Sequence, residues 1–174
     1  MRLMRLALWK NDLPQPVEKK TTTMPANDSN DSAAHSGNRL PEIADLPSAG
    51  AWLEAMGLQI ESATGNRVTA YLELGAQHHT PWGVVHGGVY TTAIESLASV
   101  GASLAVRERG EFAVGVNNST DFLRAGQEGR VDMVAEPIIQ GRVQQLWHVR
   151  IARSDDGKVV AEGRVRLQNV PLPS

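Results

Sequence analysis

The most constraining feature of this 174-residue sequence is the stretch between His86 and Arg107, which carries a single formal charge. Its twenty residues contain no proline and are mostly small or apolar, reading GGVYTTAIESLASVGASLAV. Alanine and leucine favour a helix, and a helix that is apolar nearly all round is normally buried. The stretch therefore predicts a central helix enclosed by the rest of the fold. Its one charge, Glu95, would be costly there unless it had a partner or a function.

The sequence around this helix predicts strands joined by short turns. Residues 58–74 alternate apolar and polar side chains on both sides of Gly65-Asn66, which indicates a hairpin. A short helix is expected before it, with Ser48 as N-cap and Gly57 at its end. Further strands are expected over 112–125, 129–140, 142–154 and 158–170. Long strands with short connections form an antiparallel sheet, so the fold class is α+β.

A pattern of glycine and histidine stands at the start of the central helix. Gly83, His86, Gly87 and Gly88 form Gly-x-x-His-Gly-Gly, and Glu95 follows eight residues after Gly87. This pattern resembles the signature of hotdog-fold acyl-CoA thioesterases, especially those of the phenylacetate pathway and the second 4-hydroxybenzoyl-CoA type. The resemblance covers roughly residues 47 to 170. Six residues before the histidine the family usually has Asn or Gln, whereas this sequence has Thr80.

The resemblance implies a hotdog fold, in which an antiparallel sheet wraps around one long helix. It also implies hydrolysis of an acyl-CoA to the free acid and CoA, without a metal or redox cofactor. The acyl group is not predicted. A hotdog enoyl-CoA hydratase and a non-catalytic acyl-CoA-binding or effector-sensing module remain as alternatives.

Composition and charge narrow the expected partners and location. The formal net charge is −2, so nucleic acid is not an expected partner. The sequence has no cysteine, which excludes disulfides, thiolate metal sites and a cysteine nucleophile. No metal-ligand spacing occurs, because His78 and His79 are adjacent and no other candidate ligand clusters with them. Glu95 and the Ser, Thr and Gly residues around it argue against a membrane span.

The N-terminal part of the chain differs from the rest in composition. Residues 11–40 are rich in Pro, Asn, Asp, Ser and Thr and have few large apolar side chains, so residues 1–45 are expected to be a disordered extension. The opening MRLMRLALWK lacks a long apolar run and a small-residue cleavage site, and does not predict a signal peptide. We therefore expect one thioesterase domain over 46–174 in a cytoplasmic protein.

The glycine pair suits the stabilisation of an oxyanion. The first backbone N–H groups of a helix have no partner within it, and the helix dipole adds positive charge there. A glycine also lets a substrate approach without a side chain in the way. A thioester carbonyl on the Gly87 N–H would therefore be polarised, with Gly88 beside it. The alternative is that the two glycines only allow a tight turn into the helix.

Glu95 is the expected catalytic carboxylate, acting either as general base on a water or as nucleophile on the thioester carbon. The alternative for Glu95 is a non-catalytic carboxylate, either in a structural ion pair or exposed to solvent. Ser99 lies one turn further on the same face and would orient the water or the carboxylate, or simply pack. His86 would contact the substrate region or cap the helix.

The remaining candidates come mainly from the resemblance. It places Thr80 at the thioester and the turn Gly141-Arg142-Val143 at the nucleotide arm of CoA, where Arg142 would bind phosphate. Trp82 would line the acyl pocket or pack on the loop, and Asn118 would face the CoA groove.

The spacing of the two main catalytic groups predicts a homodimer. Eight residues of helix separate Gly87 from Glu95 by about 12 Å, so one chain cannot easily bring both to one thioester. Two antiparallel copies of the helix would pair Gly87 of one subunit with Glu95 of the other. A dimer or dimer of dimers with composite sites is therefore expected, as the resemblance also implies.

Overall fold

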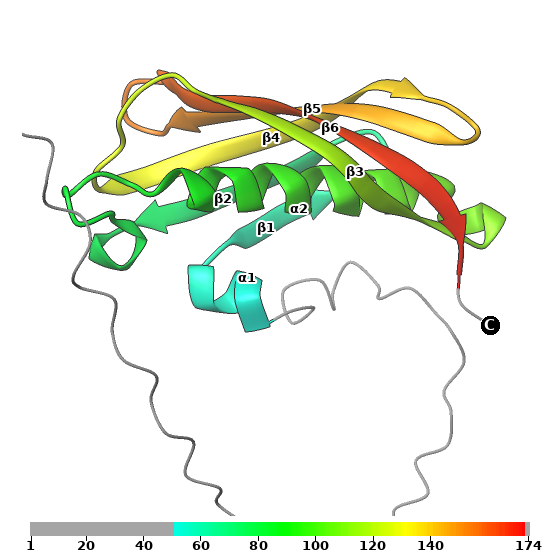
Figure 1. Cartoon of the computed structure of the whole chain (residues 1–174), viewed down its shortest axis with the longest axis horizontal. Coiled ribbons are helices and arrows are strands. Elements are labelled where there is room, and N and C mark those ends of the chain that lie inside the picture. Colours follow the sequence, from blue (N-terminus) through cyan, green and yellow to red (C-terminus); the bar gives the residue numbers. More distant parts are fainter. Residues whose placement is uncertain (1–50, 173–174) are drawn as a thin grey trace, which may run out of the picture. The chain divides into compact units, whose positions relative to one another are not determined.

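The computed structural model describes residues 51–172. These residues form a six-stranded antiparallel sheet that curves around one long helix (Figure 1). The strand order is β1-β2-β4-β5-β6-β3. The predicted α+β architecture is thus confirmed. The disordered extension over 1–45, the boundary at residue 46 and the Ser48 cap lie outside the described residues.

The elements follow the turn and strand signals of the sequence closely. The short helix α1 (Ala51–Met56) ends at Gly57, whose φ of 77° requires the left-handed conformation that glycine tolerates. The predicted hairpin is formed by β1 and β2, and the four predicted later strands are β3 to β6. Their bounds are β1 Gln59–Ala63, β2 Val68–Leu74, β3 Glu111–Phe122, β4 Gly129–Gln140, β5 Gln144–Arg153 and β6 Val159–Pro171.

The central helix α2 (Gly87–Val106) packs on the sheet with one of its faces only. That face is buried, whereas the opposite one is half-exposed and includes Thr92, Glu95 and Ser99. The expectation of a helix enclosed on all sides is therefore wrong for the single chain, because the sheet leaves Thr92, Ser96 and Ser99 half-exposed. The buried face comprises Tyr90, Ala93, Ile94, Leu97, Ala98, Gly101, Ala102 and Val106.

Helix and sheet come close where a glycine meets a tryptophan. Gly101 lies against the fully buried ring of Trp147 on β5, and a Cβ built on this glycine would be 2.4 Å from the ring. Because real Cβ atoms do not approach that closely, only glycine fits here. This contact fixes the depth at which α2 packs on the sheet.

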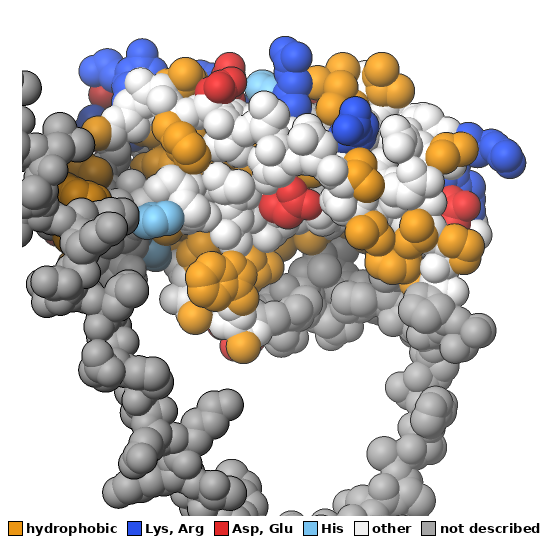
Figure 2. Space-filling view, viewed as in Figure 1, with side chains coloured by type: hydrophobic (Ala, Val, Ile, Leu, Met, Phe, Trp, Pro, Cys, Tyr) orange, Lys and Arg blue, Asp and Glu red, His pale blue; other side chains and the backbone are white. Residues whose placement is uncertain are grey.

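One edge of the sheet is formed by the long strand β3. Within residues 51–172 β3 pairs with β6 on one side and has no partner on the other, since it is last in the strand order. Val114 and Val116 on this strand are 41% and 49% exposed, and Figure 2 shows hydrophobic side chains gathered beside it. A long edge strand with apolar side chains is a ready template for pairing with another chain.

Candidate active site

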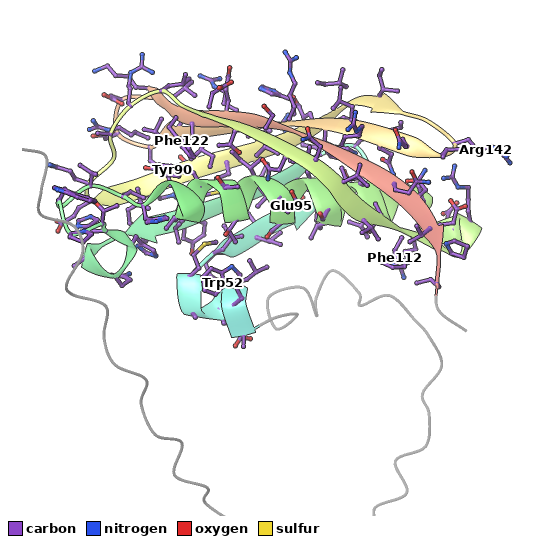
Figure 3. The ribbon with its side chains drawn as sticks, in the orientation of Figure 1. Trp52, Tyr90, Glu95, Phe112, Phe122 and Arg142 are labelled. Atoms are coloured by element: carbon purple, nitrogen blue, oxygen red, sulfur yellow. The ribbon has the colours of Figure 1, made fainter. Side chains whose placement is uncertain are left out.

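Glu95 is held against β3 by a short chain of polar side chains. The Asn118 Nδ2 group donates to Glu95 Oε2 at 2.9 Å and to the Thr91 carbonyl at 3.3 Å. The Thr120 hydroxyl in turn donates to Asn118 Oδ1 at 2.7 Å. The Asn118 amide is thereby fixed with its donor toward the carboxylate. Figure 3 shows Glu95 between α2 and β3, on the open side of the helix.

A glycine on β3 makes room for this carboxylate. A Cβ built on Gly115 would lie 2.0 Å from Glu95 Oε1, so any side chain there would displace the carboxylate. The pairing of β3 with β6 shifts register between Gly115 and Asn117, which indicates a β-bulge beside the carboxylate. Bulges commonly re-aim side chains next to active sites. Here Gly115 and Asn118 together fix where the Glu95 carboxylate lies.

The N-terminus of α2 presents one free backbone donor. The helix begins at Gly87, and the N-cap His86 accepts a hydrogen bond from the Gly88 N–H at its Nδ1 atom, at 2.9 Å. His86 therefore caps the helix, the second of its two expected roles. Within residues 51–172 the Gly87 N–H has no hydrogen-bond partner. The N–H of Gly87 is therefore free to act as the oxyanion donor that the sequence predicts, while the N–H of Gly88 is already used.

The loop before α2 uses its own polar groups to form a turn. The Thr80 hydroxyl donates to the Val84 carbonyl at 3.1 Å, and the Gly83 N–H donates to the Thr80 carbonyl at 3.0 Å. The hydroxyl proton of Thr80 is thus engaged by the loop, which leaves its oxygen as an acceptor. Trp82 is 84% exposed, so in the single chain it neither lines a pocket nor packs on the loop.

Ser99 lies one helical turn after Glu95 and is half-exposed on the same face of α2. Its hydroxyl makes no hydrogen bond within the described part of the chain, so it is available to a water or a ligand. Ser99 and Glu95 both face the side of α2 that the sheet leaves open.

A cavity of about 390 Å³ lies beside the free N–H of Gly87. Its walls include Tyr90, Leu123 and the half-exposed Phe122, whose ring lies 2.9 Å from a Cβ built on Gly87. The absence of a side chain at Gly87 thus keeps this approach open. The rings of Tyr90 and Phe122 have centroids 6.5 Å apart, and Figure 3 labels both near the start of α2. Burial raises the pKa of the Tyr90 hydroxyl above its ordinary value, so this group stays neutral.

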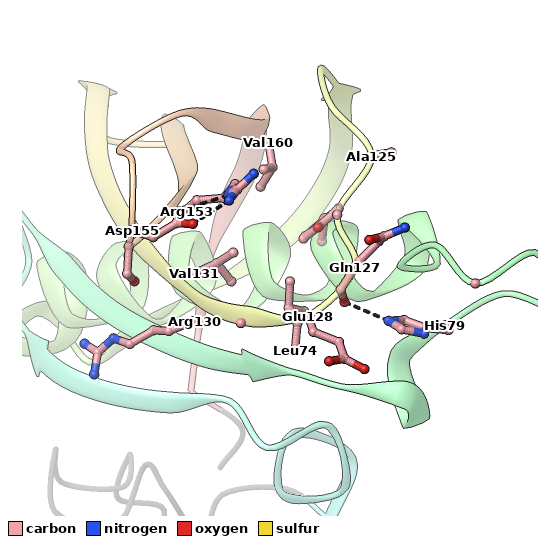
Figure 4. A pocket seen from close by; sticks show the side chains of 15 residues that line it. Leu74, His79, Ala125, Gln127, Glu128, Arg130, Val131, Arg153, Asp155 and Val160 are labelled. Carbon is pink, nitrogen blue, oxygen red and sulfur yellow. Dashed lines mark hydrogen bonds and ion pairs between the residues drawn. The ribbon is translucent and has the colours of Figure 1, made fainter.

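Figure 4 shows a larger cavity of about 730 Å³. It shares the lining residues Tyr90, Ala125 and Gly126 with the first cavity. Its rim is polar, and a hydrogen bond between His79 Nε2 and the Gln127 carbonyl (2.7 Å) crosses one end. A hydrogen bond from Arg153 lowers the pKa of Asp155 on the same rim. The Gly126 backbone lies close to the Tyr90 hydroxyl, since a Cβ built on Gly126 would be 2.2 Å from the hydroxyl oxygen.

The turn Gly141-Arg142-Val143 joins β4 and β5, at the far end of the sheet from the start of α2 (Figure 3). Arg142 and Val143 are exposed there. Asn118 lies beside Glu95, whose carboxylate accepts from its amide, and not beside this turn. The contact with Glu95 was not predicted, and the place expected for Asn118 at the CoA groove stays a prediction.

Two general features of the described residues bear on partners. Helix α2 with the turn after it, Gly87–Arg109, is long and apolar enough to cross a membrane, but it packs here on the sheet as the core helix. Within residues 51–172 no group of three or more His, Cys, Asp or Glu side chains is placed to hold a metal ion.

Comparisons with known proteins agree with this fold. The model of the thioesterase superfamily matches residues 83–160. Rv1847 of Mycobacterium tuberculosis, named only as a candidate esterase, is 45% identical over 117 residues, which is 66% of this chain and 83% of that protein. Its solved structure superposes with a TM-score of 0.68, at 42% identity, and covers 71% of this chain and 98% of that one.

Two further relatives are named for thioester hydrolysis. The 1,4-dihydroxy-2-naphthoyl-CoA hydrolase of Listeria monocytogenes is 33% identical over 56% of this chain and 79% of its own length. The structure of the Haemophilus influenzae thioesterase HI1161 has a TM-score of 0.70 at 25% identity, and covers 79% of this chain and 96% of that one.

The fold and the relatives together define the class: a hotdog protein that hydrolyses thioesters. The chain belongs to the thioesterase superfamily. Thioester hydrolysis is therefore preferred over the hydratase and the non-catalytic binding module.

Sequence reasoning missed several residues at this site. Gly115 and Thr120 position the carboxylate, and Tyr90 and Phe122 line the cavity beside Gly87. The signal for Tyr90 was present, because it lies three residues after Gly87 and thus one helical turn away. For Gly115 the signal was a glycine inside a predicted strand, which suggests a bulge or a close approach. Thr120 had no such signal, since its role depends on how β3 packs across α2.

Proposed function

We propose that this protein hydrolyses an acyl-CoA thioester to the free acid and CoA, with Glu95 as the catalytic carboxylate. The observation that carries this proposal is the presence of two groups on α2: a Glu95 carboxylate held by Asn118 and a free backbone N–H at Gly87. The Listeria relative, whose name specifies a CoA thioester, supports CoA as the carrier. The cytoplasmic location expected from the sequence remains part of the same proposal.

The site is composite in this proposal and belongs to a homodimer. Helix α2 is continuous from Gly87 to Val106, so its geometry places Gly87 and Glu95 about 12 Å apart in one chain. Glu95 lies on the open face of α2, beside the unpaired edge strand β3. A second copy docked on this face, with its helix antiparallel, would bring its own Gly87 toward Glu95. A dimer of dimers would repeat the same pair of sites.

In this dimer each subunit supplies one of the two catalytic groups of a site. The Gly87 N–H donates to the thioester oxygen and stabilises the negative charge that develops there. Glu95 either takes a proton from a water that attacks the carbonyl carbon, or attacks that carbon itself to give an anhydride that water then hydrolyses. In both routes the C–S bond breaks, and the CoA sulfur leaves and is protonated. Ser99 would orient the water from the same face, and the Thr80 oxygen would accept from the bound substrate.

The CoA portion extends away from the thioester in this proposal. Gly141, Arg142 and Val143 would bind its nucleotide arm, with the Arg142 guanidinium on phosphate. Trp82 and the exposed ring edge of His86 would border the thioester on the loop side. The acyl group would enter the cavity beside Tyr90 and Phe122, whose apolar walls suit an aliphatic or aromatic chain.

A panel of short, long and aromatic acyl-CoA substrates, followed by thiol release, tests the activity. With the best substrate, Glu95→Gln should lower kcat by about 100-fold or more, the range that general-base catalysis supplies. The substitution is nearly isosteric, and the amide oxygen of Gln can still accept from Asn118, so the melting temperature should not change. Glu108→Gln, at an exposed acid after α2, is the matched control and should keep full activity. Turnover of Glu95→Gln within tenfold of wild type would remove Glu95 from the mechanism.

A further inference from the structure

A buried pair of side-chain amides lies directly behind the β4–β5 turn. Asn169 on β6 is 7% exposed, and its Nδ2 group donates to the carbonyls of Gly141 (3.1 Å) and Arg142 (3.0 Å). The Asn169 backbone N–H donates to the Val143 carbonyl at 2.8 Å. One residue therefore bonds to the backbone of all three turn residues.

The second amide connects this anchor to α2. Gln145 is 1% exposed, and its Nε2 group donates to Asn169 Oδ1 at 2.8 Å and to the Ala102 carbonyl of α2 at 2.9 Å. The Trp147 indole N–H donates to Gln145 Oε1 at 3.0 Å. Every polar atom of the two amides is thus paired. Such a network specifies one arrangement, because leaving a buried donor or acceptor unpaired is costly.

The network fixes the backbone of an exposed turn. The side chains of Arg142 and Val143 face solvent, and Ile139 beside them is 60% exposed. Figure 3 shows Arg142 at the tip of the turn, pointing away from the body of the domain. A guanidinium next to exposed apolar side chains on a rigid turn suits a ligand that has both phosphate and an apolar arm.

We propose that Asn169, held by Gln145, is a positioning residue for the nucleotide arm of CoA. It fixes the turn carbonyls, and through them the direction of the Arg142 side chain, before the ligand arrives. This inference rests on the proposed function, because it needs an acyl-CoA substrate. Asn169 does not touch the ligand: it acts through the turn, and Gln145 ties that turn to the helix that carries Glu95.

The test compares one acyl group on two carriers: full CoA, and pantetheine, which lacks the nucleotide. Wild type should prefer the CoA thioester in kcat/KM. Asn169→Leu should reduce that preference about tenfold, through KM for the CoA substrate, because the freed turn no longer presents Arg142. Its kcat with the pantetheine thioester should stay within about twofold of wild type. Asn169→Asp keeps the acceptor for Gln145 but loses both donors to the turn, and should show the same pattern if the leucine variant does not fold.

The matched control is Gln168→Leu on the same strand. Gln168 accepts a hydrogen bond from Gln144 at 3.0 Å, but its side chain does not contact the turn carbonyls, so the wild-type preference should be retained. Equal losses with both carriers in the Asn169 variants would reduce the network to a structural role and overturn the inference. A wild type that hydrolyses both carriers equally well would also overturn it, while leaving the proposed function intact. Hydrolysis of neither carrier would overturn both.

Discussion

Tyr90 carries the one buried side-chain polar atom within residues 51–172 that has no hydrogen-bond partner. Its hydroxyl is enclosed next to Gly126, between the two cavities near the start of α2. Burying a hydroxyl without a partner costs free energy, so this group works against folding of the single chain. Such an orphaned group is expected at a functional site more than in an ordinary core.

Replacing Tyr90 by phenylalanine should therefore stabilise the protein. We expect Tyr90→Phe to raise the free energy of unfolding by about 1 kcal/mol, since the ring is kept and only the unpaired hydroxyl is lost. Denaturant titration measures this change. Tyr71→Phe is the control: Tyr71 is half-buried under the Arg130 guanidinium, 4.0 Å from its ring centroid, and should change stability little. A less stable Tyr90→Phe protein would show that the hydroxyl has a partner after all.

The sequence predicts Glu95 and Gly87 as the catalytic groups because both follow from the helix and from the glycine pattern at its start. It did not identify the partner of Glu95. Asn117 and Asn118 are adjacent, and alternation along β3 would choose between them only if the strand were regular. The bulge between Gly115 and Asn117 changes which side chains face α2. A glycine inside a strand suggests a bulge, but it does not show which of the two asparagines then faces Glu95.

At the scale of elements, the strand positions were predicted well from the turn residues. Gly65, Gly126, Gly141 and Gly157 separate the strands that the alternation predicts, and the observed bounds differ from the expected ones by a few residues at most. The environment of α2 was predicted less well. Its composition of small and apolar residues shows that it packs closely, but not that the sheet covers only part of it and leaves Glu95 half-exposed beside the edge strand β3.

The packing of α2 on β5 gives a prediction at this scale. Gly101→Ala should lower the free energy of unfolding by about 2 kcal/mol, because the new methyl group would overlap the Trp147 ring. This loss is the net change: the cost of the overlap outweighs the gain of about 1 kcal/mol that alanine gives a helix over glycine. Ser96→Ala, on the open face of the same helix, is the control and should change stability by no more than about 0.5 kcal/mol. An unchanged or raised stability for Gly101→Ala would mean that α2 can move away from the sheet at little cost.

At the scale of the whole molecule, the two proposed catalytic groups of a single chain cannot meet at one thioester. The free N–H of Gly87 and the Glu95 carboxylate lie on one rigid helix, about 12 Å apart by helix geometry. The open face of α2 and the edge of β3 adjoin each other, and both would be covered by a second copy of the chain. The proposed dimer accounts for both features, since it pairs the edge strand and completes two sites together.

Complementation between two inactive variants tests this composite site most directly. Gly87→Pro removes the backbone donor, and proline suits the first position of a helix. The preceding residue already has the extended ψ of 130° that proline requires, and only the exposed Phe122 ring must shift. Glu95→Gln removes the catalytic carboxylate. Each variant alone should be inactive, because every site in its homodimer lacks one of the two groups.

In a mixed dimer, one site combines the intact Gly87 of one subunit with the intact Glu95 of the other, and the second site carries both lesions. Random mixing makes about half of the dimers mixed, each with one working site of two, so about a quarter of wild-type activity should return. The measurement is thiol release by a mixed dimer isolated with two different affinity tags. Recovery near that level is the predicted result. A verified mixed dimer that remains as inactive as its parents would contradict the composite site and place both groups within one subunit.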